Sequence, residues 1–325
     1  MQERLVSVVI ATHNRARLLE QALSSLAGQD HRPLEVVVVD DGSTDNTSQR
    51  VATLEATWRG YPGLALSYQH QRNAGPAKAR NRGMRSARGD YILFMDDDDL
   101  MAPDAISQLV RALGGRRDAA LAYGGHADVD AEGRTAPQLH LPAPIRSQRA
   151  LLEEMIGGSW FVPIHGNLFT RQALERIGPW NAKLTSQEDD EFILRAILQD
   201  VSFFPAPGAR VFYRQHVGVR RSQPGAGNAQ GQARRLYDDL AIRQLAFDTL
   251  AARQELPRYH SAFVDWYRRL QERYRPLLEK TDLDRYAVLT WAREAHGSEA
   301  TDRRGRATPH QDSRTPWTGP EALTA

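Results

Sequence analysis

The sequence predicts an α/β protein with a doubly wound, mostly parallel sheet that has helices on both faces, followed by a C-terminal helical appendage. Three observations support this fold class. Short apolar runs alternate with helical patterns through residues 5–95. These runs show little polar alternation, as expected of parallel strands covered on both faces. Beyond residue 231, the apolar spacing is purely helical.

The predicted strands and helices of residues 1–100 alternate along the chain. Strands are expected at residues 5–11, 34–39, 64–69 and 91–95, where the apolar runs lie. Asn14 is predicted to cap a first helix, and further helices are expected at residues 44–58 and 76–86. Pro76 opens the last of these, because proline suits the first turn of a helix. This alternation predicts right-handed crossovers within one sheet.

The pattern becomes less regular after residue 100. A helix is predicted at residues 103–113, a strand at 119–123, and a hairpin with a loop in the Gly- and Pro-rich segment 124–144. Helical spacing returns at residues 187–199, and two short strands are expected at 201–204 and 209–213. Residues 223–231, rich in Gly, Gln and Ala, predict a linker.

Composition excludes some classes of function. The formal charge is +2, from 42 Lys and Arg against 40 Asp and Glu, so no nucleic-acid partner is expected. The chain has no cysteine, which excludes disulfides and thiolate zinc sites. It shows neither a signal peptide nor an apolar run of about 18 residues. We therefore expect a cytoplasmic protein, either soluble or peripheral at the inner face of the membrane.

Polar segments follow three of the predicted strands, at the point where each strand ends. They are Thr12-His13-Asn14, Asp40-Asp41 and Asp96-Asp97-Asp98-Asp99. Ligands of open parallel sheets bind outside the carboxyl ends of the strands. We therefore expect the three segments to line one crevice.

The four consecutive acids at residues 96–99 predict a divalent cation site. Such carboxylates repel one another unless a cation lies among them, and Mg²⁺ or Mn²⁺ prefers oxygen ligands. If the segment is extended, side-chain alternation points Asp96 and Asp98 to the same side. The alternative is an acidic loop surrounded by water.

A basic helix start lies between these acids and the second strand. Gly75 and Pro76 begin the predicted helix, and Lys78 and Arg80 fall in its opening turns. A helix N-terminus with cationic side chains can hold a diphosphate. The alternative is an ordinary basic face of a helix.

These motifs closely resemble, in order and spacing, the family 2 glycosyltransferases of the GT-A fold. The resemblance covers the segments 11–15, 39–45, 73–83 and 94–99. It also implies an acceptor-side acidic motif, which Gln187-Glu188-Asp189-Asp190-Glu191 matches, and a later Tyr-Arg-x-His segment, which Tyr213-Arg214-Gln215-His216 matches.

The resemblance also implies roles for individual residues. Those implied to bind the nucleotide are Thr12, His13, Asn14, Asp40, Asp41, Arg80, Asp96 and Asp97. Among them, His13 stacks on the base, Asp40 accepts from it and Asp96 lies near the ribose. Asp98 is the implied metal ligand and Asp189 the implied catalytic base. His216 is a second metal ligand or, alternatively, a structural residue.

Three further residues of the acceptor-side half have open interpretations. Glu188 is expected to cap a helix rather than take part in chemistry. Arg195 is expected to pair with a neighbouring acid. Trp180 either lines the acceptor site or closes the core.

The predicted reaction is the transfer of a sugar, of the hexosyl class, from a nucleotide-diphosphate donor to an acceptor hydroxyl. The departing diphosphate gains negative charge, so a cation is needed beside it, and the acceptor needs a base on the opposite face. A single displacement of this kind inverts the anomeric centre. The family implies a UDP- or dTDP-type donor, and the acceptor is a glycan, a lipid-linked molecule or a small molecule. The alternatives are a nucleotidyltransferase and a catalytically inactive sugar-nucleotide-binding or scaffolding protein.

We expect a GT-A catalytic domain at residues 1–222, with a nucleotide-binding half (1–100) and an acceptor-side half (101–222). A helical region at residues 232–297 and a disordered tail at 298–325 follow. The helical region has one aromatic face and nearby arginines. It either caps the catalytic domain, mediates homo-oligomers or touches a membrane surface.

Overall fold

A computed structural model of the chain describes residues 4–131, 133–141, 145–215, 229–279, 283 and 285–305. Its strands are β1 (Val6–Thr12), β2 (Leu34–Asp40), β3 (Leu64–His70), β4 (Tyr91–Asp96), β5 (Leu100–Met101), β6 (Ala120–Val129), β7 (Thr135–His140), β8 (Asn167–Thr170) and β9 (Ser202–Arg214). Its helices are α1 (Ala16–Ala27), α2 (Thr47–Trp58), α3 (Pro76–Ser86), α4 (Ala105–Leu113), α5 (Gln148–Gly157), α6 (Arg171–Ile177), α7 (Glu188–Leu198), α8 (Ala229–Ala252), α9 (His260–Leu278) and α10 (Ala287–Gly305). Short 3₁₀ turns lie at Ile164–Gly166 and Leu256–Tyr259.

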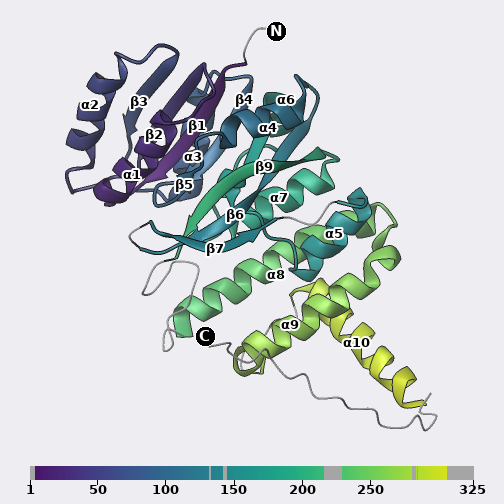
Figure 1. The fold of residues 1–325 in the computed structure, drawn as a ribbon. Helices are drawn as coiled ribbons and strands as arrows, with labels where there is room; N and C mark the ends of the chain where they lie inside the picture. Colours follow the sequence, from purple (N-terminus) through teal and green to yellow (C-terminus); the bar gives the residue numbers. More distant parts are fainter. Residues whose placement is uncertain are drawn as a thin grey trace, which may run out of the picture.

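The strands form one sheet in the order β3-β2-β1-β4-β8-β6-β9-β5, with β7 paired to β6 (Figure 1). The pairs among β3, β2, β1 and β4 are parallel, whereas β8 is antiparallel to both of its neighbours. The predicted mostly parallel α/β fold is therefore confirmed. The two short strands expected at residues 201–204 and 209–213 are instead one strand, β9, which changes register against β6 near Gly125.

Helices cover both faces of the sheet, and β4 shows how its residues divide between them. Ile92 and Phe94 pack in one apolar cluster with α3, α5, α6 and α7. Leu93 and Met95 pack in the other cluster with α1, α2 and α4. The alternation of a buried strand thus supplies apolar side chains to two layers, as the unbroken apolar runs indicate.

The beginnings of α1 and α2 differ from the sequence prediction. Asn14 has a φ of 52° and does not cap α1, which begins at Ala16. Asp45 takes that part, because its Oδ2 accepts from the backbone N–H of Ala16 at 3.2 Å. Its Oδ1 accepts from the backbone N–H of Thr47 at 3.1 Å, so α2 begins at Thr47 rather than at residue 44. One carboxylate therefore accepts from the first backbone N–H of both helices, although the N-cap residues themselves are Arg15 and Asn46.

The C-terminal helices pack against the sheet domain. The aromatic face predicted for α9 is buried in the same cluster as α5, α6 and α7; its members include Phe263, Trp266, Tyr267, Leu270 and Tyr274. Helix α9 lies against α5, and α8 lies against α7 (Figure 1). Most of the predicted linker, residues 223–228, lies outside the described residues.

Helix α10 extends to Gly305, into the segment where a tail is predicted, and residues 306–325 lie outside the described part of the chain. Among the helices that the structure describes, none has the length and apolarity to cross a membrane.

Candidate active site

The carboxyl ends of β1, β2 and β4 lie side by side at one edge of the sheet. Thr12 pairs with Asp40 across β1 and β2, and Ala11 pairs with Asp96 across β1 and β4. The three polar segments that follow these strands are therefore neighbours. This is the convergence that the sequence predicts.

Asp40 is buried and its carboxylate is fixed from two directions. The backbone N–H of Ser43 donates to Oδ1 at 2.7 Å, and the hydroxyl of Tyr68 donates to Oδ2 at 2.6 Å. Burial and the neighbouring Asp40 both raise the pKa of Tyr68, so this hydroxyl keeps its proton and remains a donor.

Asp41 is bonded entirely to the loop before α3. Its Oδ1 accepts from Gln71 Nε2 and from the backbone N–H of Ala74, both at 2.8 Å, and its Oδ2 accepts from the backbone N–H of Gly75 at 2.7 Å. Gly75 has a φ of 94°, a conformation that favours glycine. Asp41 therefore sets the position of the α3 N-terminus.

His13 and Asn14 lie on the exposed rim of this edge. His13 Nδ1 lies 2.9 Å from the carbonyl oxygen of Asp41, and Asn73 Nδ2 lies 3.3 Å from the same ring nitrogen. The Asn14 side chain accepts from the backbone N–H of Thr44 at 2.7 Å. His13 is an exposed residue, while Asn14 fixes the loop after β2.

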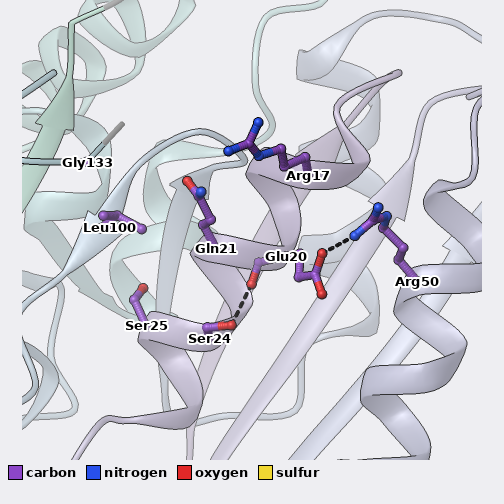
Figure 2. Close-up of a pocket in the computed structure, with 8 residues that line it drawn as sticks. All are labelled: Arg17, Glu20, Gln21, Ser24, Ser25, Arg50, Leu100 and Gly133. Carbon is purple, nitrogen blue, oxygen red and sulfur yellow. Dashed lines mark hydrogen bonds and ion pairs between the residues drawn. The ribbon is translucent and has the colours of Figure 1, made fainter. Parts of the chain in front are cut away.

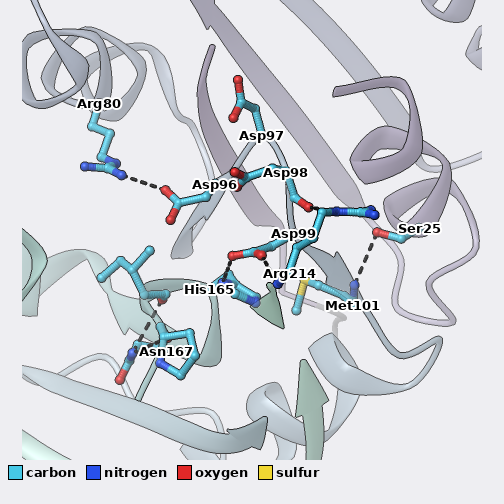
Figure 3. Close-up of polar contacts among 12 residues, drawn as sticks. Ser25, Arg80, Asp96, Asp97, Asp98, Asp99, Met101, His165, Asn167 and Arg214 are labelled. Carbon is cyan, nitrogen blue, oxygen red and sulfur yellow. Dashed lines mark hydrogen bonds and ion pairs between the residues drawn. The ribbon is translucent and has the colours of Figure 1, made fainter. Parts of the chain in front are cut away.

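Residues 96–99 form a turn rather than an extended segment, with the backbone N–H of Asp99 3.4 Å from the carbonyl oxygen of Asp96. Figure 3 shows Asp97 pointing away from Asp96 and Asp99. Asp97 accepts from Thr12 Oγ1 at 2.7 Å and from Arg15 at 2.9 Å. Burial raises the pKa of Asp97 to about 6, with Asp98 adding to the increase and Arg15 opposing it.

The other three acids of the turn gather their oxygens in one place. Ligand oxygens of Asp96, Asp98 and Asp99 all lie within 4.8 Å of one another. Burial, and then the charges of Asp98 and Asp96, raise the pKa of Asp99 well above its usual range. Carboxylate oxygens that repel one another in this way are suitable ligands for a hard divalent cation. Asp96 and Asp98 therefore face one point, as predicted, but a turn brings them there and Asp99 joins them.

His165 was not found from the sequence. It is completely buried, and its Nδ1 lies 3.2 Å from Oδ2 of Asp99, although the two groups are not aligned for a hydrogen bond. Burial lowers the pKa of His165 to about 4, so the ring is neutral near pH 7. A single histidine in a short 3₁₀ turn has no spacing signal, and only the fold shows that it lies beneath the acids (Figure 3).

Arg214 holds the acidic turn from the other side. Its backbone N–H donates to Asp99 Oδ1 at 2.7 Å, and its Nε donates to the carbonyl oxygen of Asp98 at 2.6 Å. Its guanidinium also donates to Gln21 of α1 at 2.8 Å. His216, the last residue of the predicted Tyr-Arg-x-His motif, lies outside the described residues.

Gln21 also lines an open hollow of about 670 Å³ beside α1 (Figure 2). Its other lining residues are Arg17, Glu20, Ser24, Ser25, Arg50, Leu100 and Gly133. The hollow adjoins the acidic turn through Leu100 and Arg214, but it contains none of the residues predicted to bind the donor.

Arg80 connects the acidic turn to α7. It is 7% exposed, and it donates to Asp96 Oδ1 at 2.6 Å and to Glu188 Oε1 at 3.3 Å. Its guanidinium lies 4.6 Å from the ring centre of Trp180, which is buried and stacks on Phe192. Glu188 therefore pairs with Arg80 and does not cap the helix, while Trp180 belongs to the core.

Asp189 lies in the first turn of α7 and is partly exposed. Burial raises its pKa to about 7, with Asp190, Glu188 and Asp96 adding to the increase, and with Arg80 opposing it. Arg80 joins Asp96 of the acidic turn to Glu188, the residue before Asp189, so the first turn of α7 lies beside the acidic turn. Its neighbour Arg195 pairs with Glu191 at 2.7 Å, as predicted.

The open sheet, the polar strand ends, the acidic turn and the acid on α7 are typical of glycosyltransferases with a GT-A-type fold. More specifically, the model of the family Glycosyl transferase family 2 matches residues 7–178, and the chain belongs to this family.

Relatives and solved structures agree with this membership. An uncharacterized glycosyltransferase of Haemophilus influenzae is 30% identical over 203 residues, which are 62% of this chain and 64% of that protein. The matched regions span 17% and 53% of relatives from Rickettsia conorii and Nostoc, so the chain covers less than two thirds of these proteins.

Two solved structures share the fold. S. aureus TarS in complex with UDP-GlcNAc is 21% identical, with a TM-score of 0.54 and 92% of each chain covered. The mannosyltransferase PcManGT from Pyrobaculum calidifontis, in complex with GDP-Man and Mn²⁺, is 20% identical, with a TM-score of 0.51, 94% of this chain covered and 89% of that one.

Proposed function

We propose that this chain transfers a hexosyl group from a UDP- or dTDP-type sugar to an acceptor hydroxyl by a single inverting displacement. The observation that supports this most is that Arg80 connects two acidic groups, one on each side of its guanidinium. The turn at Asp96 to Asp99 comes from the strand edge, whereas Asp189 comes from α7. A displacement reaction needs positive charge near its leaving group and a base near its nucleophile.

On the donor side, Asp98 with Asp96 and Asp99 would hold Mn²⁺ or Mg²⁺, and His216 is proposed as a further ligand. When bound, the cation would neutralise charge on the departing diphosphate. Asp97 accepts from Thr12 and Arg15. We therefore propose that it positions these residues at the edge of the sheet and does not contact the nucleotide directly.

The nucleotide base would lie at the rim formed by His13 and Asp40. His13 is exposed and would stack on the base, and Asp40 lies at the end of β2 with a fixed carboxylate. Thr12 and Asn14 shape this rim, and Asp41 places the α3 N-terminus beside the diphosphate. The complexes of TarS with UDP-GlcNAc and of PcManGT with GDP-Man and Mn²⁺ support a nucleotide-sugar donor.

On the acceptor side, Asp189 would take the proton from the attacking hydroxyl. A carboxylate with a pKa of about 7 is a stronger base than an ordinary aspartate and is still half ionised near neutral pH. Arg80 binds Asp96 with one nitrogen and Glu188 with the other. These two acids are therefore already paired, and Asp189 would be the acid that takes the proton.

A screen of purified protein against a panel of UDP, dTDP and GDP sugars tests the proposal. Released nucleoside diphosphate is measured with Mn²⁺, with Mg²⁺ and with EDTA, in the presence and absence of candidate glycan acceptors. We expect release with one donor and either metal, and loss of release in EDTA. Donor binding without turnover under every condition would favour the inactive binding or scaffolding protein.

A further inference from the structure

Asp238 of helix α8 binds the segment that precedes α7. Asp238 is 7% exposed, and its Oδ2 accepts four hydrogen bonds from two consecutive residues. Thr185 donates its backbone N–H at 3.0 Å and its hydroxyl at 2.7 Å. Ser186 donates its backbone N–H at 2.8 Å and its hydroxyl at 3.0 Å. Bonds to an ionised acceptor are stronger than those between neutral groups, so this contact firmly fixes the two residues.

The fixed segment leads directly to the proposed base. Gln187 follows with a φ of 58°, a left-handed conformation that is unfavourable for a residue with a side chain. Its carbonyl oxygen accepts from the backbone N–H of Glu191 at 3.1 Å and so begins α7. The direction in which α7 starts, and with it the position of Asp189, therefore depends on where Ser186 is held.

Asp238 is itself carried by a helix that is anchored to the sheet domain. Arg243 of α8 is buried and donates to the carbonyl oxygens of Ile156 at 3.2 Å and Met155 at 3.3 Å, at the end of α5. The apolar cluster that includes Leu236 and Leu240 of α8 continues into α7. Asp238 therefore has a defined position relative to the active site.

We propose that Asp238 is a positioning residue for sugar transfer, which fixes the segment before α7 so that Asp189 points at the acceptor hydroxyl. This inference rests on the proposed role of Asp189 as the base. Glu188, directly before Asp189, is fixed by Arg80. The first turn of α7 is thus held by the donor-binding half through Arg80 and by the C-terminal helices through Asp238, which makes those helices part of the catalytic unit.

The test compares Asp238→Ala with Asp238→Asn and with the neighbouring Asp239→Asn. Asp239 is buried to a similar extent, 9% exposed, but it contacts Arg243 and Trp266 instead of the segment before α7. The measurements are kcat for transfer at saturating donor, the donor dissociation constant, and the melting temperature. All rates are taken well below the lowest melting temperature.

We expect Asp238→Ala to lower kcat by about 10- to 100-fold, because a small displacement of a reacting group has an effect of this size. Donor affinity should stay within about twofold, since the donor contacts lie on other elements. Asp238→Asn retains an acceptor oxygen and should recover part of the rate. Asp239→Asn weakens the partner of Arg243, so it should reduce the melting temperature, and it should lower kcat less than Asp238→Ala does.

Two results would overturn the inference: a wild-type kcat in Asp238→Ala, or equal losses of kcat in the Asp238 and Asp239 variants. If Asp238→Ala does not fold, the double variant Thr185→Val, Ser186→Ala removes both hydroxyl donors and takes its place, with a lower kcat expected and a wild-type kcat contradicting. Asp189→Asn is measured in parallel. An active Asp189→Asn refutes the base itself, whereas an inactive one beside an active Asp238→Ala refutes only the positioning role.

Discussion

At the scale of single residues, the proposed role of Asp189 as the base predicts a pH dependence for sugar transfer. Burial and the charge of Asp190 raise the pKa of Asp189 to about 7. Only the ionised form can accept a proton, so kcat at saturating donor should rise as the pH increases through about 7. Below that value it should fall by about tenfold per pH unit.

Asp190→Asn provides a matched control for this pH profile. It removes one of the charges that raise the pKa of Asp189, so the acid limb should move to lower pH. The profile of kcat between pH 5 and 8.5 checks both expectations. A wild-type kcat that does not change over this range would mean that Asp189 does not titrate in the rate-limiting step.

The acidic turn predicts different effects for two adjacent residues. Arg15 donates to both, at 2.9 Å to Asp97 and at 2.7 Å to Asp98, but Asp98 belongs to the group whose oxygens converge, whereas Asp97 is bonded to Thr12. Asp98→Asn should therefore weaken Mn²⁺-dependent binding of the nucleotide by about tenfold or more, and Asp97→Asn should weaken it less. Calorimetric titration of the nucleotide with and without Mn²⁺ measures this. The opposite order of the two variants would place the cation elsewhere.

How much of this site the sequence predicts depends on the residue. Asp96 and Asp98 could be paired from the run of acids alone, but the pairing comes from a turn and not from alternation along a strand. His165 and Asp238 could not be found, because each is a single residue whose partner is distant in the chain. Contacts of this kind depend on tertiary packing, which local patterns do not encode.

At the scale of elements, Asp45 ties the beginnings of α1 and α2 together. Asp45→Ala removes acceptors from both helices and should lower the free energy of unfolding by about 1–2 kcal/mol, while Asp45→Asn should lower it less. Hydrogen bonds from Thr47 and Ala16 outweigh partial burial and lower the pKa of Asp45. This contribution is therefore present above the unfolded pKa of about 4 and is lost as pH falls through the lower folded value.

Urea unfolding of the wild type and the two Asp45 variants at pH 7 measures these effects. If Asp45→Ala were as stable as the wild type, the shared cap would have no energetic role. The sequence assigned the cap of α1 to Asn14, which instead has a positive φ. Asparagine and aspartate have similar capping preferences, so residue type alone could not separate them.

An element whose ends are determined by local residues is predicted well from the sequence, whereas one whose length depends on a distant partner strand is not. Helix α3 has the predicted bounds, because Pro76 begins it and Ala87 turns to an extended conformation after it. Strand β6 runs past Gly124 and Gly125 to Val129, although glycine weakens an isolated strand. Its pairing with β9 continues on both sides of this glycine pair, so the partner strand and not the local sequence determines its length.

At the scale of the whole molecule, one apolar cluster joins the sheet domain to the C-terminal helices. Removing all residues after 228 would expose the surfaces of α5 and α7 that α8 and α9 cover. Because burial of apolar area is the main stabilising term, we expect this fragment to aggregate or to melt at least about 10 °C lower than the full chain. Size-exclusion chromatography and thermal melting measure this, and a monodisperse fragment with full activity would contradict it.

In the proposed mechanism, a base on α7 and a donor site at the strand edge act together in sugar transfer. Asp189→Asn tests it most directly, because it keeps the size of the side chain and removes its basicity. We predict that transfer falls by about 10²- to 10⁴-fold while the donor dissociation constant changes only modestly. Near wild-type transfer in this variant would contradict the account.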